Sequence, residues 1–138
     1  MAFVELPNAA PILIVEDNEE SREGLADYLR LQGFIVAEAS NGRDAITLAQ
    51  TLEPCLILLD VMMPGANGHE VLEALGRMPS MQNTPVVMTS DFEHRVPPGA
   101  VGALQKPLRL DTLLEYVHAY ATRAQRLPLQ LRDVTPPR

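Results

Sequence analysis

The sequence predicts an α/β fold in which helices cover both faces of a parallel sheet. Three observations support this fold class. Short apolar runs alternate with segments of helical periodicity, and the connections between them are short. Two of the runs, residues 12–15 and 56–59, are unbroken stretches of branched aliphatic residues, which is typical of strands buried on both faces of a parallel sheet.

Length and composition indicate one ordinary globular domain. The chain has 138 residues, of which 46% are hydrophobic. Its net charge is −7 and it has no basic stripe, which argues against a nucleic-acid surface. No apolar stretch approaches the roughly 20 residues that a membrane-spanning helix requires. The single cysteine, Cys55, excludes an intramolecular disulfide. We therefore expect a cytoplasmic protein that binds neither membranes nor nucleic acid.

The first strand runs into Glu16 and Asp17, and a helix follows it. Residues 17–21 offer capping side chains and first-turn acids, which make a favourable helix start. Apolar residues then recur at helical spacing until Gly33, which we expect to end the helix at its C′ position. Residues 34–37 are predicted to form the second strand.

The middle of the chain continues the alternation. The pair Asn41-Gly42 ends the second strand, and Pro54 sets a limit to the helix that follows. The third strand leads directly to Asp60, and a third helix is stopped by Pro79. The elements predicted here are a helix around residues 45–49, a strand over 56–59, a loop over 64–68 and a helix around 71–75.

Two strands and a helix are predicted in the last part of the chain. Residues 86–88 form a strand that ends at Thr89, and residues 101–104 form another. An apolar stripe over residues 110–121 predicts a helix, with Thr112 and Glu115 spaced as a capping box.

The connection over residues 91–100 breaks the pattern. A helix is expected between the last two strands, but Pro97-Pro98-Gly99 forbids helical structure in the second half of this segment. At most one turn fits at residues 92–95, so the fourth helix of the fold is predicted to be shortened or absent. The predicted organisation is an N-terminal extension over residues 1–10, the folded domain over 11–125 and a flexible, proline-bearing tail over 126–138.

Acidic residues follow two of the buried strands. Parallel strands bring their carboxyl ends to one edge of the sheet, so Glu16, Asp17 and Asp60 are expected to meet there. Clustered carboxylates either share protons or bind a cation, and hard oxygen ligands with open water positions suit Mg²⁺. Lys106, after the last strand, would add a positive charge, and Thr89 a hydroxyl group. Such a set can stabilise an incoming phosphoryl group, with Asp60 as the carboxylate best placed to attack phosphorus.

This pattern resembles the receiver domain of two-component response regulators. The resemblance extends over residues 11–120 and is carried by Glu16-Asp17, Asp60 with Met63-Pro64, Thr89-Ser90 and Lys106-Pro107. It implies a flavodoxin-like, doubly wound sheet of five parallel strands in the order 2-1-3-4-5. It also implies an acceptor protein rather than a turnover enzyme. Its phosphoryl donor would be a sensor histidine kinase or a histidine phosphotransfer protein, and its signal would pass to a downstream protein target.

By this resemblance, Asp60 is the phosphoacceptor of an Mg²⁺-dependent site. Asp17 and Asp60 would bind the metal directly, together with the backbone carbonyl of Met62. Glu16 would contribute to metal binding through water.

The resemblance implies further roles for residues around the acceptor. Thr89 would hydrogen-bond the phosphoryl group and report its presence, and Lys106 would pair with it. The bond between Lys106 and Pro107 is often cis in this family. Met62 and Asp91 occupy positions at which family members tune hydrolysis of the acyl phosphate.

Two departures from the family pattern leave an alternative open. Receivers usually couple the residue at Thr89 to an aromatic three residues before the lysine, a position that is Ala103 here. The connection to Lys106 is also several residues shorter than usual. The chain could therefore be a constitutive docking or adaptor module whose phosphorylation does not switch its output face. A hydrolase of the haloacid-dehalogenase type is a weaker alternative, because such enzymes need an acid where Met62 stands. No output domain is expected after Tyr120, so we interpret the chain as a stand-alone receiver or one excised from a larger protein.

Overall fold

Five strands form one parallel sheet in the computed structural model, which describes residues 10–63, 66–91 and 95–121. The strand order is β2-β1-β3-β6-β7, which is the predicted doubly wound order once the short strands β4 and β5 are set aside. Every pairing within this sheet is parallel. The strands are β1 (Ile12–Val15), β2 (Val36–Ala39), β3 (Leu56–Asp60), β6 (Val86–Ser90) and β7 (Gly102–Gln105).

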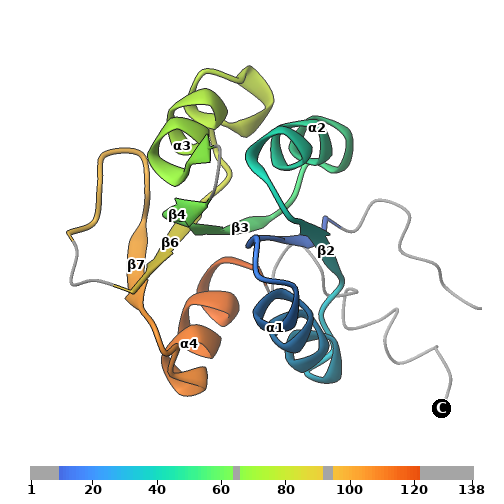
Figure 1. The fold of residues 1–138 in the computed structure, drawn as a ribbon. Helices are drawn as coiled ribbons and strands as arrows, with labels where there is room; N and C mark the ends of the chain where they lie inside the picture. Colours follow the sequence, from blue (N-terminus) through green and yellow to red (C-terminus); the bar gives the residue numbers. More distant parts are fainter. Residues whose placement is uncertain (1–9, 64–65, 92–94, 122–138) are drawn as a thin grey trace, which may run out of the picture.

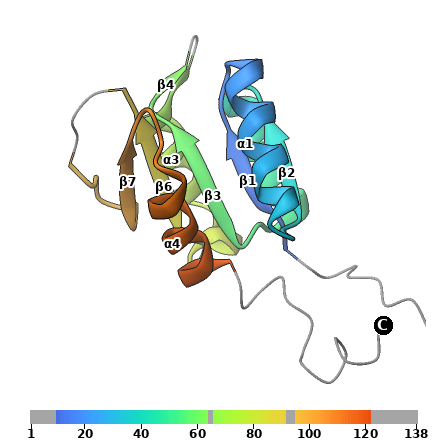
Figure 2. The ribbon, with the colours of Figure 1, turned by 90° about the horizontal axis from the view of Figure 1, so that it is seen from below.

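Helices cover both faces of the sheet, as predicted. Helices α1 (Glu19–Leu31) and α4 (Leu110–Tyr120) lie on one face, and α2 (Gly42–Leu52) and α3 (Gly68–Gly76) lie on the other (Figure 1). Successive side chains of a strand point to opposite faces, so β1 contributes to two separate cores. Leu13 and Val15 belong to the core under α2 and α3, whereas the alternate residues of β1 belong to the core under α1 and α4. The strand arrows run the same way in Figure 2, so the carboxyl ends of the strands share one edge of the sheet.

Helix α1 begins and ends where the sequence predicts. Asn18 is the N-cap, and its side chain accepts a hydrogen bond from the backbone N–H of Ser21 at 2.8 Å. Gly33 has a φ of 94°, the left-handed conformation that glycine tolerates best.

The second strand begins two residues later than predicted. The backbone N–H of Phe34 donates to the carbonyl of Leu29 at 3.1 Å, so Phe34 still belongs to the hydrogen-bonded end of α1. Strand β2 therefore starts at Val36 instead of Phe34. The composition of residues 34–37 indicated a strand correctly, but helix termination delayed its start.

A short hairpin follows β3 where the sequence predicted only a loop over residues 64–68. Strand β4 (Met62–Met63) pairs antiparallel with β5 (Ala66–Asn67), while residues 64 and 65 lie outside the described part of the chain. A 3₁₀ turn over Pro79–Met81 follows α3, close to the predicted helix stop.

The connection between β6 and β7 forms no helix over residues 95–101. The single turn predicted at residues 92–95 falls mainly on residues 92–94, which lie outside the described part. Gly99 adopts a φ of 96°, and its backbone lies against Leu72 of α3. The chain then re-enters the sheet as the N–H of Val101 donates to the carbonyl of Val86 at 2.8 Å.

Helix α4 begins two residues before the predicted capping box. Its N-cap is Arg109, whose side chain makes no capping hydrogen bond, and Thr112 is the third helical residue. The prediction that Thr112 and Glu115 form a capping box is wrong, because the helix begins at Leu110 and the carboxylate of Asp111 accepts the hydrogen bond at this end. The Asp111 carboxylate accepts from the N–H of Thr112 at 2.8 Å and from Arg109 at 3.1 Å.

The outer limits of the predicted domain are not described by the structure. Residues 1–9 of the predicted extension and the whole predicted tail, residues 126–138, lie outside the described residues. Among the residues that the structure does describe, no helix combines the length and the apolarity needed to cross a bilayer.

Candidate functional site

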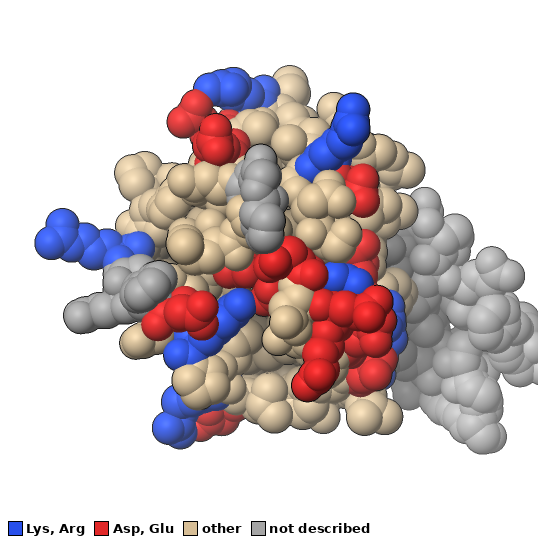
Figure 3. All heavy atoms as spheres, viewed as in Figure 1, with Lys and Arg blue, Asp and Glu red and all other residues tan. Residues whose placement is uncertain are grey.

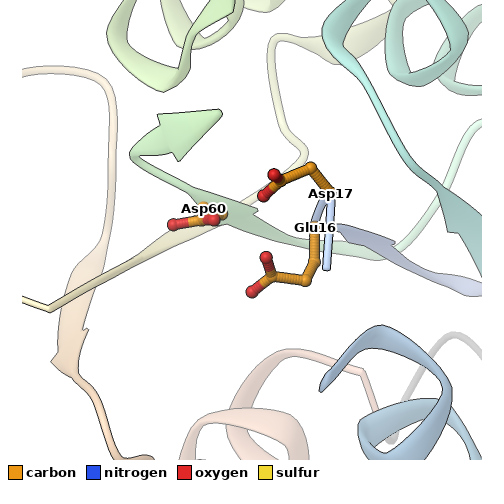
Figure 4. A group of neighbouring side chains, drawn as sticks. All are labelled: Glu16, Asp17 and Asp60. Atoms are coloured by element: carbon orange, nitrogen blue, oxygen red, sulfur yellow. The ribbon is translucent and has the colours of Figure 1, made fainter. Parts of the chain in front are cut away.

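Three carboxylates meet at the carboxyl ends of β1 and β3. The two strands are neighbours, with Val15 opposite Leu59, so the residues that follow them come together. One carboxylate oxygen each from Glu16, Asp17 and Asp60 lies within 4.8 Å of the others. Figure 4 shows the two side chains from the end of β1 extending toward Asp60. This is the meeting of acidic groups that the two strand ends predicted.

Lys106 brings a positive charge into the acidic cluster. It follows β7, and its backbone N–H donates to the carbonyl of Ser90 at 2.6 Å. Its Nζ lies 2.6 Å from Glu16 Oε1 and 3.5 Å from Asp60 Oδ2. The peptide bond between Lys106 and Pro107 is cis. Figure 3 shows the wider setting, with acidic side chains gathered near the centre of this face and over α1 and basic side chains beside them.

Burial of Asp60 makes its negative charge unfavourable in the metal-free protein. The residue is only 3% exposed. Burial raises the pKa of Asp60 from 3.8 to about 6, and a hydrogen bond and the charge of Glu16 act in the same direction. The backbone N–H of Met62, 3.2 Å from Asp60 Oδ1, and the charge of Lys106 partly oppose this rise. A positive ligand would relieve the crowding of charge.

Glu16 and Lys106 form a tight ion pair beside Asp60. Burial alone would raise the pKa of Glu16, but hydrogen bonds from Lys106 and from the N–H of Asn18 bring it below its usual range. Burial would likewise lower the pKa of Lys106, but the hydrogen bond to Glu16 and the nearby acids raise it above its ordinary value. Both groups are therefore charged at neutral pH.

Thr89 and Asp91 lie beside the carboxylates. Thr89 is buried and pairs with Asp60 in register across β3 and β6. A cavity of 640 Å³ lies beside the carboxylates, between α1 and the start of α4. Its lining includes Thr89, Asp91, Glu16 and Lys106. Asp91 is exposed, and its charge contributes to the raised pKa of Lys106.

The donor set fits a hard divalent cation. All three acidic residues offer carboxylate oxygens, two of them are buried, and burial has raised the pKa of Asp60. Mg²⁺ prefers such oxygen ligands and usually keeps several waters, which the exposed Asp17 would leave room for. Met62 begins β4, two residues after Asp60, and is 55% exposed; its backbone carbonyl is the third direct ligand that the resemblance implies.

Three residues at this site were missed by the sequence analysis. Asn18 donates its N–H to Glu16 Oε2 at 3.2 Å, and Arg22 donates to the backbone carbonyl of Glu16 at 3.0 Å. Gly68 donates its N–H to the carbonyl of Val61 at 2.9 Å and lies directly against the backbone after Asp60. The sequence pattern assigns Asn18 only to the start of a helix and Gly68 only to a loop. The role of Arg22 left no sequence signal beyond its being the first basic residue after an acidic run.

Most of the chain matches the model of a single protein family. Residues 12–118 match the model of the response regulator receiver domain. The nitrate/nitrite response regulator protein NarL of Escherichia coli K12 is 37% identical over 118 residues, which is 81% of this chain and 55% of that protein. A cyclic di-GMP phosphodiesterase of Thermotoga maritima is 38% identical over 117 residues, 81% of this chain but 31% of that protein. The chain thus spans about a third to a half of the length of these relatives.

Shorter relatives and solved structures match along nearly their whole length. The polar-differentiation response regulator DivK of Brucella anthropi is 30% identical over 115 residues, covering 79% of this chain and 94% of that protein. The chemotaxis protein CheY4 of Vibrio cholerae superposes with a TM-score of 0.73 at 29% identity, covering 80% of this chain and 98% of that one. Sequence and fold comparisons therefore agree.

Proposed function

Since this chain belongs to the response regulator receiver domain family, a family of two-component phosphorylation signalling, we propose that it accepts a phosphoryl group on Asp60. The donor would be a phosphohistidine of a sensor histidine kinase or of a histidine phosphotransfer protein. The observation that supports this most is the cluster of three carboxylates with Lys106 Nζ 2.6 Å from Glu16 and 3.5 Å from Asp60. In this proposal the protein acts in the cytoplasm as an acceptor that signals to a downstream protein, and it turns over no substrate.

The transfer itself needs a nucleophile, charge stabilisation and exclusion of water. A carboxylate oxygen of Asp60 attacks phosphorus, the P–N bond to the donor imidazole breaks, and the imidazole keeps the electron pair and takes up a proton. Lys106 and the hydroxyl of Thr89 donate hydrogen bonds to the phosphoryl oxygens. Because Asp60 is 3% exposed, the reacting carboxylate is largely shielded from bulk water.

Glu16, Asp17, Asp60 and the backbone carbonyl of Met62 are the groups that we assign to the metal. Mg²⁺ bound there would neutralise charge on the carboxylates and on the phosphoryl oxygens. Met62 and Asp91, both exposed at the rim, are assigned to tuning hydrolysis of the acyl phosphate.

The Mg²⁺ requirement gives a direct test of the proposal. The protein is expected to gain one phosphoryl group from acetyl phosphate in the presence of Mg²⁺, as measured by intact mass spectrometry. In excess EDTA the rate of this gain should fall at least about tenfold, since the carboxylates would repel the incoming phosphate. Equal labelling with and without the metal would contradict the assignment.

Metal binding is expected to weaken at acid pH. The raised pKa of Asp60, about 6, means that below this pH a proton must leave before the carboxylate can bind Mg²⁺. The apparent affinity should therefore fall by about tenfold per pH unit below pH 6 and level off above pH 7. Titration with Mg²⁺ at constant ionic strength between pH 5 and pH 8 measures this. A flat profile would show that Asp60 does not compete with a proton for the metal.

A docking module insensitive to phosphorylation is the second candidate function. Ala103 stands where receivers usually carry an aromatic, and residues 95–101 form no helix. Addition of Mg²⁺ and beryllofluoride, a phosphoryl mimic, followed by amide NMR distinguishes the two functions. A switch requires shift changes that reach residues 95–101 and α4. Changes confined to residues around Asp60 would favour the docking module.

A further inference from the structure

Asp17 lacks the side-chain contacts that hold the other two carboxylates. Glu16 accepts hydrogen bonds from Lys106 and from the N–H of Asn18, and Asp60 accepts one from Met62. Within the described residues, the carboxylate of the exposed Asp17 takes part in no hydrogen bond or ion pair. The direction of the Asp17 side chain therefore depends on how the backbone around it is held.

The peptide group between Glu16 and Asp17 lies just beyond the sheet. The ladder between β1 and β2 ends with Val15 opposite Ala39, and the N–H of Glu16 makes one more bond, to the carbonyl of Ala39 at 3.0 Å. The carbonyl of Glu16 points past that ladder and receives its hydrogen bond from a side chain of α1. Arg22 Nη1 donates to it at 3.0 Å. This contact fixes the plane of the peptide group from which Asp17 extends.

Arg22 is itself held in place by an acid on β2. Its Nε lies 3.3 Å from Glu38 Oε1, and its side chain is only 13% exposed. A planar guanidinium can donate in two directions at once, which suits it to join an acid on β2 and a carbonyl just beyond the end of β1. Glu38 is also paired with Arg30, at 3.2 Å, and Arg30 donates to the carbonyl of Val36. The two arginines thus share one acid, but only Arg22 reaches the metal site.

We infer that Arg22 is a positioning residue of the metal site: aimed by Glu38, it holds the Glu16 carbonyl and thereby orients Asp17 for the cation. This inference rests on the proposed function, because it assumes that Asp17 is a metal ligand. It extends the site to the ion pair between Arg22 of α1 and Glu38 of β2, neither of which is assigned as a ligand of the cation. Residues that orient metal ligands in this way commonly change metal affinity by ten to a hundredfold.

The test compares two substitutions that remove a partner of the same acid. Arg22→Gln removes the contact with the Glu16 carbonyl, whereas Arg30→Gln removes a contact of Glu38 and leaves Glu16 untouched. We expect the dissociation constant for Mg²⁺ to rise about tenfold in the Arg22 variant and less than about twofold in the Arg30 variant. Isothermal titration well below the unfolding temperature of each variant ensures that only folded protein is compared.

A second measurement separates positioning from general destabilisation. In metal-free protein, the amide resonances of Asp17 and Asn18 should shift or broaden in Arg22→Gln and stay as in the wild type in Arg30→Gln. Arg22→Lys, which keeps the charge but loses the planar fork, should restore less than half of the lost affinity. Equal Mg²⁺ affinity of the two glutamine variants, or full rescue by lysine, would overturn the inference while leaving the proposed function intact. Failure of the wild type to bind Mg²⁺ would instead remove the proposed function, and the inference with it.

Discussion

Replacing Asp60 with asparagine is expected to abolish phosphoryl incorporation from acetyl phosphate in the presence of Mg²⁺. The amide has no anionic oxygen with which to attack phosphorus, and none of the other acids at the site occupies the same buried position at the end of β3. Intact mass spectrometry over a time course would show the gain of a phosphoryl group in the wild type and none in the variant. Labelling of Asp60→Asn at the wild-type rate would exclude Asp60 as the acceptor.

Asp91→Asn is the matched control for this experiment. It makes the same chemical change in an exposed acid that lines a cavity together with Glu16 and Lys106 of the site. Because Asp91 is assigned only to tuning hydrolysis, this variant should still be labelled, with at most a changed lifetime of the acyl phosphate. Loss of labelling in the Asp91 variant with retention in the Asp60 variant would reverse the assignment.

The stability of the Asp60→Asn variant shows whether loss of labelling reflects chemistry or misfolding. The folded state raises the pKa of Asp60 from 3.8 to about 6, so the native wild type binds more protons than the unfolded chain between these values. Its stability contribution from this group is therefore greatest below pH 4 and is lost as pH rises through 6. In EDTA at pH 7 the variant should be more stable than the wild type by up to about 3 kcal/mol, and most of the difference should be lost by pH 4. Urea unfolding at both pH values measures this.

Gly68→Ala is expected to destabilise the protein by about 2 to 4 kcal/mol and to weaken Mg²⁺ binding. A Cβ at this position would lie 2.7 Å from the Cα of Val61 and would collide with the carbonyl oxygen of Asp60. Both are backbone atoms, so no side-chain rotation can relieve the overlap, and the end of β3 must move. Urea unfolding in EDTA gives the loss of stability, and an Mg²⁺ titration gives the effect on the site.

Gly24→Ala provides the corresponding control in an open part of the structure. Gly24 lies inside α1, and a Cβ there would meet no atom within 4 Å. Since alanine favours helix more than glycine does, the variant should gain about 0.5 to 1 kcal/mol of stability. If Gly68→Ala lowered the free energy of unfolding no more than Gly24→Ala, the close packing of α3 on the backbone after Asp60 would not contribute to stability.

The sheet was predictable because buried parallel strands leave strong local signals. In a domain of this size, apolar runs such as residues 12–15 and 56–59 are stable only as strands in the centre of the sheet. The residues that follow them therefore lie at the same edge of the sheet. Element boundaries were less predictable, because competing hydrogen bonds decide them. Phe34 stayed bonded to α1 instead of opening β2, and Asp111 displaced the expected cap on α4.

The sequence predicted the charged groups of the site but not the residues that hold them in place. The acids at strand ends and Lys106 were all singled out by residue type and place, and they meet in the structure. Arg22 was not predicted, because its partner at the site is a backbone carbonyl and its orientation depends on an ion pair between α1 and Glu38 of β2. Such contacts depend on relative orientation in three dimensions, for which a single sequence offers no pattern.

The ion pair between Glu16 and Lys106 joins residues that are 90 positions apart in the chain. Contacts of such large sequence separation close late, since the intervening loop entropy must first be offset by the rest of the sheet. A partly folded chain in which β7 is not yet paired cannot hold this ammonium beside Glu16, so formation of the Glu16–Lys106 pair during refolding marks the addition of the last strand to the sheet.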